Sequence, residues 1–386
     1  MTAHQKFLFA ASAFIATVFA AGLAAAFDSA QYKNASSARL VANPEKPKSG
    51  VVTPKLTEIW SAGEENDASG IVLNQPFQVR VAADGTVFIL DWGDTCIKVV
   101  DENGKFVRQI GRKGQGPGDL DTPAWFDVDA AGNIFLADSR NMRVSRFDRE
   151  GNYISSYRME KFSSEIRVDK SGRLFLEETG RGDTELTSEF TKIQNTFSLV
   201  RSEKDGKNPV RIGPFQAEVT LMLRRGDSVV SAGSPNSPMT GWGVDPNGRI
   251  WAGYNGTYEI GVYDAEGKPL FRFNREFKPL KSKSFAKLDL AGQKATTLSE
   301  HLPAFVQDFF FDDAGNAWFR LFRNEPDEKD EKAKNEPYLY DVFSPEGVYL
   351  KQVIIPFRLS QVRKDRMYAI VETEEGFRVL KCYRFE

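Results

Sequence analysis

Short runs in which apolar and polar residues alternate recur along the chain, in pairs joined by a tight turn. Five of these pairs share one layout: a glycine at the turn, an apolar residue four positions before it and an aromatic residue three positions after it. Such alternation predicts β-hairpins with one packed face. The turn glycines are Gly85, Gly132, Gly172, Gly248 and Gly315, and the aromatic residues are Phe88, Phe135, Phe175, Trp251 and Trp318.

A second glycine turn follows each hairpin, at Gly104, Gly151, Gly206, Gly267 and Gly347. In three copies the two glycines are 19 residues apart, which leaves room for two further strands of ordinary length. Each unit is therefore expected to hold four antiparallel strands. Repeated four-stranded units are typical of β-propellers, where radial repetition protects the sheet edges.

A degenerate sixth copy, "SQVRKDRMYAIVE", places Asp365 and Arg366 at the turn and Tyr368 in the aromatic position. The last unit ends after its third strand, "RVLKCYRF", whereas the segment Leu56–Trp60 stands alone before the first unit. We expect this segment to complete the last blade and close the ring. The predicted fold class is all-β: a six-bladed β-propeller over residues 55–386, closed by an N-terminal strand.

The second unit, "GRKGQGPGDLDTPAWFDVDAAGNIFLADSRNMRVSRFDREGNYI", resembles an NHL repeat. The matching residues are Pro123, Asp129, Gly132, Asn133, Asp138, Asn141, Arg143, Val144 and Phe147. The chain as a whole is similar to secreted bacterial six-bladed β-propeller proteins with NHL-like repeats. The resemblance implies the fold but not an activity, because that fold hosts lyases, lactonases and binding modules.

The N-terminus has the pattern of a secretory signal peptide. Lys6 precedes an apolar run over Phe7–Leu23 that ends in three alanines, which predicts a signal peptide over residues 1–26. A retained membrane anchor is the alternative. Residues 27–54 lack apolar periodicity and are predicted to be a flexible lead-in. We expect a periplasmic or secreted protein with no stable membrane insertion after cleavage.

The charge balance and the small numbers of histidine and cysteine limit the functions that fit this chain. The chain has 51 Lys+Arg against 53 Asp+Glu, which argues against a nucleic-acid partner. Beyond the signal peptide the sole histidine is His301, so a zinc site is not expected, and no catalytic residue, metal or cofactor is predicted. Cys96 and Cys382 either form a disulfide or are separate buried side chains. A closed ring without bare sheet edges predicts a monomer.

The candidate site lies where the innermost strands begin, at the mouth of the central channel. Counting back seven residues from each turn glycine gives Gln78, Trp125, Glu165, Gly241 and Asp308, and counting back five gives Arg80, Asp127, Arg167, Gly243 and Phe310. Charged residues in three consecutive blades either bind a polar or anionic ligand or form a structural Arg-Asp-Arg network. The predicted ligand-binding residues are Arg80, Trp125, Asp127, Glu165, Arg167, Trp242 and Asp308, with the two tryptophans as stacking surfaces.

Two functions fit these observations. The first is a non-catalytic exported propeller that binds a protein, peptide or saccharide at one rim of the channel. The alternative is a hydrolase or lyase of the lactonase-like class, with Asp127, Glu165 and Asp308 around a divalent cation. Three insertions offer further recognition surface. They are residues 179–196, a segment of helical character over 274–304, and the charged loop 324–337.

Overall fold

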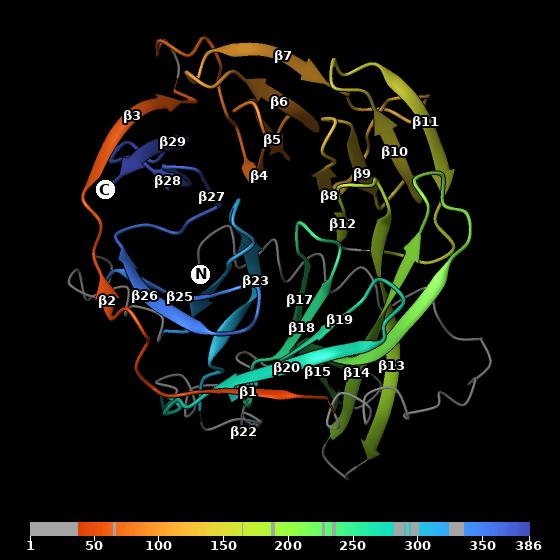
Figure 1. The fold of residues 1–386 in the computed structure, drawn as a ribbon. Coiled ribbons are helices and arrows are strands. Elements are labelled where there is room, and N and C mark those ends of the chain that lie inside the picture. Colours follow the sequence, from red (N-terminus) through yellow and green to blue (C-terminus); the bar gives the residue numbers. More distant parts are fainter. Residues whose placement is uncertain are drawn as a thin grey trace.

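The protein is a six-bladed β-propeller, with its blades arranged around a central axis (Figure 1). A cavity lies along this axis. The computed structural model describes residues 38–64, 67–163, 165–186, 190–225, 228–233, 237–281, 289–290, 293–294, 301–323 and 336–386. Among these residues there is no helix, and therefore none that could cross a membrane. The predicted signal peptide over 1–26 lies outside the described residues.

Each blade is an antiparallel sheet whose first strand lines the channel. The innermost strands are β4 (Pro76–Val81), β8 (Pro123–Val128), β12 (Ile166–Val168), β17 (Thr240–Val244), β23 (Phe305–Phe311) and β27 (Gln361–Arg363). The second strands are β5 (Val87–Asp91), β9 (Ile134–Asp138), β13 (Leu174–Leu186), β18 (Ile250–Tyr254), β24 (Ala317–Leu321) and β28 (Arg366–Glu372).

The two outer positions follow the same order around the ring. The third strands are β6 (Cys96–Val100), β10 (Arg143–Phe147), β14 (Phe190–Ser202), β19 (Glu259–Tyr263), β25 (Tyr338–Phe343) and β29 (Arg378–Phe385). The fourth strands are β7 (Phe106–Ile110), β11 (Tyr153–Arg158), β15 (Val210–Arg225), β20 (Pro269–Arg275), β26 (Tyr349–Ile355) and, in the last blade, β3 (Leu56–Ala62).

Strand β3 closes the ring as predicted. It pairs antiparallel with β29, with Trp60 opposite Cys382. The indole Nε1 of Trp60 also donates a hydrogen bond of 2.9 Å to the carbonyl of Glu102 in the first blade. Arg366 Nη1, from the last blade, donates to the same carbonyl at 2.7 Å. The closing strand is therefore bonded to the last blade through its backbone and to the first blade through the Trp60 side chain.

The prediction of a flexible lead-in over 27–54 is wrong for the strands β1 (Leu40–Asn43) and β2 (Val51–Val52). Strand β1 pairs in parallel with the outer edge of β20, and β2 pairs in parallel with β26. The fourth and fifth blades thus each gain a fifth strand. Residues 27–37 of the same prediction lie outside the described residues.

One buried side chain holds this N-terminal segment in place. Asn43 Nδ2 donates to the carbonyls of Gly347, at 2.8 Å, and Asn274, at 2.9 Å. Its Oδ1 accepts a bond of 2.8 Å from the backbone N–H of Tyr349. These groups belong to two different blades, so Asn43 ties the fourth blade to the fifth. Composition could not predict that this segment forms strands, because its bonds are made with residues more than 200 positions away.

The predicted turns and the aromatic column are confirmed. All ten turn glycines have positive φ, for example 93° at Gly85. The six aromatic residues of the second strands are buried: Phe88, Phe135, Phe175, Trp251, Trp318 and Tyr368. In the sixth hairpin the turn falls one residue earlier than expected, since Lys364 takes the positive φ of 52° and Arg366 already begins β28.

The described parts of the insertions contain β-strands. Residues 179–186 and 190–196 prolong β13 and β14 into a long hairpin, and β16 (Ser228–Gly233) adds a fifth strand to that blade. The helical character predicted within 274–304 is wrong for its described part, which contains the short pair β21 (Asp289–Leu290) and β22 (Gln293–Lys294). The charged loop is outside the described residues over 324–335.

The two cysteines are both free, so the disulfide alternative is wrong. Cys96 begins β6 in the first blade, and Cys382 lies within β29 in the last blade, between Tyr368 and Trp60. Both are completely buried. Burial raises the pKa of the Cys96 thiol to about 12 and that of the Cys382 thiol to about 11, which makes both poor nucleophiles at neutral pH.

Replacing Asn43 by alanine tests the N-terminal tie. We expect Asn43→Ala to lower the free energy of unfolding by about 2 kcal/mol, because buried backbone groups in two blades lose their partners. Asn152→Ala is the control, since that exposed amide bonds within its own turn, to Asp148. Chemical denaturation of both variants gives the comparison, and equal losses would contradict the role of Asn43.

Candidate functional site

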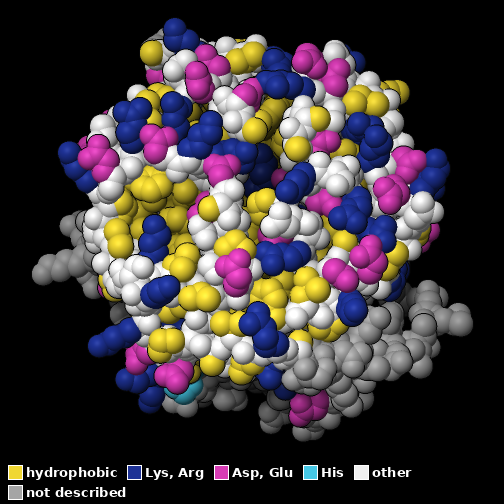
Figure 2. All heavy atoms as spheres, in the orientation of Figure 1, with side chains coloured by type: hydrophobic (Ala, Val, Ile, Leu, Met, Phe, Trp, Pro, Cys, Tyr) yellow, Lys and Arg dark blue, Asp and Glu magenta, His cyan; other side chains and the backbone are white. Residues whose placement is uncertain are grey.

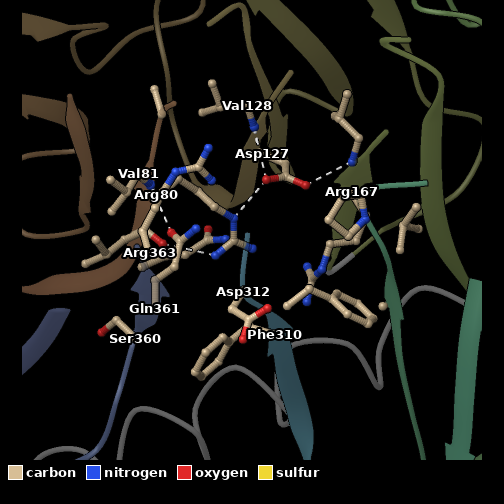
Figure 3. Close-up of a pocket in the computed structure, with 18 of the residues that line it drawn as sticks. Arg80, Val81, Asp127, Val128, Arg167, Phe310, Asp312, Ser360, Gln361 and Arg363 are labelled. Atoms are coloured by element: carbon tan, nitrogen blue, oxygen red, sulfur yellow. Dashed lines mark hydrogen bonds and ion pairs between the residues drawn. The ribbon is translucent and has the colours of Figure 1, made fainter. Parts of the chain in front are cut away.

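Each innermost strand contributes one residue to a ring around the channel. These residues lie directly opposite the aromatic column in the strand register. In chain order they are Arg80, Asp127, Arg167, Gly243, Phe310 and Gln361, and we call them the channel ring. The first five are the residues that the sequence identified by counting back from the turn glycines. Figure 3 shows how Arg80, Asp127, Arg167 and Gln361 converge from separate blades.

A cavity of about 460 Å³ occupies the channel, and all six residues of the channel ring line it. Its lining extends from the innermost strands to the turns that follow them. The face of the propeller shown in Figure 2 is hollowed near its centre, with basic and acidic side chains around the hollow. Trp125 and Asp308, also predicted, line the same cavity. Glu165 and Trp242 do not line it and instead lie behind the wall, in contact with Arg167.

Arg80 and Asp127 form an ion pair between the first two blades. Arg80 Nε lies 2.8 Å from Asp127 Oδ1. The other carboxylate oxygen, Oδ2, accepts a bond of 2.9 Å from the backbone N–H of Val168 in the third blade. Asp127 therefore joins three consecutive blades. These contacts agree with the structural interpretation of the charged arc, in which the acidic residue neutralises its arginine neighbours.

Arg167 is the most enclosed of the channel arginines, with 7% of its side chain exposed. Its guanidinium carbon lies 5.0 Å from the ring centre of Trp125 and 5.4 Å from that of Trp242, which is cation-π distance on both sides. Trp242 is only 2% exposed. The prediction of Trp242 as a stacking surface for a ligand is therefore wrong, because Arg167 and the core cover the ring.

Glu165 forms an ion pair with Arg167 and has an altered acidity. Burial raises the pKa of Glu165 to about 8, and the carboxylates of Glu177 and Asp308 add to the rise while Arg167 opposes it. Asp308 Oδ1 lies 3.9 Å from Arg167 Nη2. The pair is thus a proton-sensitive support for the channel wall, in which Arg167 is enclosed and 22% of the Glu165 side chain is exposed.

The remaining acidic residues of the cavity wall cap turns. Asp245 is an example: its Oδ1 accepts bonds from the backbone N–H groups of Asn247 and Arg249, at 2.8 and 3.0 Å. Asp129, Asp169 and Asp312 do the same in their own blades. Within the described part of the chain, no group of three or more His, Cys, Asp or Glu residues could hold a metal ion. Asp127, Glu165 and Asp308 are accordingly paired with arginines and do not form a cation site.

The NHL-like residues of the second blade have structural roles. Asp138 accepts bonds from the backbone N–H groups of Asp121 and Thr122, at 2.9 and 3.0 Å. Arg143 donates through Nη2 to the carbonyls of Gly116 and Asp119, both at 2.7 Å. These bonds hold the loop between the first and second blades against the second.

Sequence reasoning missed the contribution of the last blade. Arg358, Gln361, Arg363 and Arg378 all line the cavity. The sixth hairpin has no turn glycine, so counting back from a glycine had no starting point there. Counting back from the aromatic column was the available signal, because Gln361 lies opposite Tyr368 just as Arg80 lies opposite Phe88.

Comparisons with known proteins agree on the fold. A family model described as a 6-bladed beta-propeller (DUF5128) matches residues 70–208. No curated protein sequence matches the chain. A protein from Bacteroides fragilis described as exported is 14% identical, with 90% of this chain and 99% of that one covered and a TM-score of 0.48.

Two further solved structures are similar over most of their length. A member of the duf4221 family from Bacteroides vulgatus is 10% identical, with 86% of this chain and 99% of that one covered and a TM-score of 0.46. Virginiamycin B lyase from Staphylococcus aureus is 12% identical, with coverages of 85% and 99% and a TM-score of 0.38. At these identities and TM-scores, we base no conclusion about this chain on the three solved structures.

The pairing of Glu165 with Arg167 predicts a characteristic pH dependence. Because the pKa of Glu165 is raised in the folded state, that state retains a proton which the unfolded chain has lost, and stability falls as pH rises from 4.5 towards about 8. Arg167→Met removes the opposing cation and raises this pKa further. Below about pH 8 Glu165 is protonated in both folded proteins, so we expect the two stability curves to run parallel there. Above it the wild type regains the charged pair and the variant does not, so the loss should grow by up to about 1.4 kcal/mol per pH unit.

Unfolding measured from about pH 5 to about pH 9 tests this linkage. The control is Arg358→Met, because Arg358 is 55% exposed and is not among the charges that shift the pKa of Glu165. Its stability should follow the wild-type curve. A constant difference between Arg167→Met and wild type across the pH range would contradict the assignment.

Proposed function

We propose that this protein is an exported, non-catalytic binding protein, a monomer that takes a protein, peptide or saccharide ligand at the mouth of its central channel. The observation that carries the proposal is the channel ring, whose six positions carry five different residue types. An open cavity of about 460 Å³ is within the range of small-ligand sites. The signal-peptide pattern of residues 1–26 supports export.

The cavity has two unlike walls. One side is polar and is formed by Arg80, Asp127, Arg167 and Gln361 of the channel ring. The other side is apolar and is formed by Gly243 and Phe310. At Gly243 a Cβ atom would lie 3.1 Å from the rings of both Phe309 and Phe311, so glycine lets the aromatic strand of the fifth blade approach closely. A ligand that carries polar groups on one side and apolar groups on the other fits such a cavity.

The pairing of charged side chains favours binding over catalysis. General acids, bases and nucleophiles need a reactive atom within reach of the substrate. Asp127 and Asp308 each bond to an arginine, and the other wall carboxylates are held by turn N–H groups. No observation on the described residues supplies the donor set that the alternative, a divalent-cation-dependent hydrolase or lyase, would require.

A matched pair of phenylalanine variants tests the proposed function. Phe310 lies in the channel ring, and Phe106 is exposed on the outer strand β7. Libraries of short peptides and oligosaccharides, screened by calorimetry or NMR, should yield binders of the wild-type protein. Phe310→Ala should weaken the best binder about tenfold, because it removes an aromatic contact, while Phe106→Ala leaves affinity unchanged.

Thermal unfolding of both variants confirms that they remain folded. The proposal fails if neither library yields a binder, or if binding responds to Phe106→Ala and not to Phe310→Ala.

A further inference from the structure

The cavity has unequal numbers of free hydrogen-bond donors and acceptors. Its carboxylates are occupied: Asp127 by Arg80 and Val168, and Asp313 by the backbone N–H of Lys364 at 2.6 Å. Each guanidinium, in contrast, carries five N–H donors and needs only a few of them for these pairs. The arginines therefore keep N–H donors that are not used within the protein. A ligand that presents acceptors is complementary to this surface.

Two arginines of the last blade have fewer carboxylate partners than Arg167, which meets both Glu165 and Asp308. Arg358 lies in the loop before β27 and meets a single carboxylate, Asp308 of the fifth blade, at 3.3 Å. Arg378 begins β29, and among the described residues no carboxylate lies within ion-pair distance of it. Both line the cavity.

These two cations also repel each other. Burial lowers the pKa of Arg378, and the charge of Arg358 lowers it further, while Glu372 opposes the change. Arg320, on β24 of the fifth blade, shows the same pattern, with burial first and Arg358 second. The charge of Arg358 therefore acts unfavourably on two other cations, and one of them, Arg378, lines the same cavity. An anion placed among them would relieve this repulsion.

We propose that Arg358 and Arg378 form the anchor for a carboxylate of an acidic peptide, with Phe310 contacting an apolar side chain next to it. This inference rests on the proposed function and names its ligand class. A guanidinium matches a carboxylate through two parallel N–H···O bonds.

A peptide fits better than a saccharide at this seam. Sugar hydroxyls both donate and accept hydrogen bonds, and the acceptors on this part of the wall are already occupied, as Asp308 and Asp313 show. The carboxylate of an acidic side chain, in contrast, only accepts, so it suits the arginine donors of this wall better than a hydroxyl does. The apolar residues Phe310 and Leu359, which line the same cavity, offer contact for a neighbouring side chain.

Two peptide libraries that differ in one atom group test the anchor. Both consist of N-acetylated, C-amidated hexapeptides, with glutamate fixed at one position in the first library and glutamine in the second. Binders from the glutamate library should lose about tenfold in affinity when the glutamate is replaced. Their affinity should also fall as the salt concentration is raised from about 0.05 M to about 0.5 M, because salt screens charge attraction.

A matched arginine pair locates the anchor. Arg358→Gln and Arg378→Gln should each remove most of the preference for glutamate. Arg384→Gln is the control, because Arg384 has a similar exposure of 54% and a similar single partner, Asp365 at 3.2 Å, on the same blade. It should keep the full preference. Thermal unfolding of the three variants checks that each is folded.

The outcomes separate this inference from the function on which it rests. If glutamine peptides bind as tightly as glutamate peptides, or if Arg384→Gln has the same effect as Arg358→Gln, the anchor is wrong while the channel remains a binding site. Uronate-containing oligosaccharides that bind through Arg358, without any peptide binder, would overturn the peptide assignment. A failure of every probe overturns the proposed function itself.

Discussion

The antiparallel pairing of β3 with β29 is the interaction on which the rest of the structure depends. It adds the missing outer strand to the last blade from a segment more than 300 residues away, and Trp60 carries the connection on to the first blade. A ring closed in this way brings six innermost strands around one axis. The channel and its mouth exist because the first and last blades are held together.

Closure of the ring brings one repeated strand position from all six blades together around the channel. In every blade the residue opposite the aromatic column faces the channel, so the fold fixes where that side chain lies and leaves its identity free. Arg80, Asp127 and Arg167 make one arc charged, and the ion pair and backbone bond of Asp127 stabilise that arc. Gly243 and Phe310 make the opposite wall apolar. The chemistry of the mouth thus follows from the residue that each blade carries at this one position.

Much of this architecture could be predicted from the sequence because its signals are local. The period of two, the turn glycines and the aromatic position each lie within one hairpin, and the lone segment Leu56–Trp60 stood out against the unpaired last blade. That residues 40–43 form a strand was not predictable. Asn43 is held there by hydrogen bonds to Asn274, Gly347 and Tyr349, which belong to blades distant along the chain.

The site was predictable in part for the same reason. Counting from glycines found Arg80 and Asp127, but the sixth hairpin lacks that glycine, so Gln361 was missed. Arg358 and Arg378 lie before the innermost strand and on the third strand, and tertiary packing brings them to the cavity. The sequence also could not show that Trp242 is covered, since burial of a ring by an arginine from the neighbouring blade depends on tertiary packing.

A crystal structure of the protein bound to a selected ligand is the most direct test of the claim that the channel mouth is the functional site. The account predicts ligand density within the cavity, in contact with Phe310 and with an acceptor at hydrogen-bond distance from Arg358. Density on the outer strands of the blades, such as β7 or β15, with an unoccupied channel mouth would contradict it.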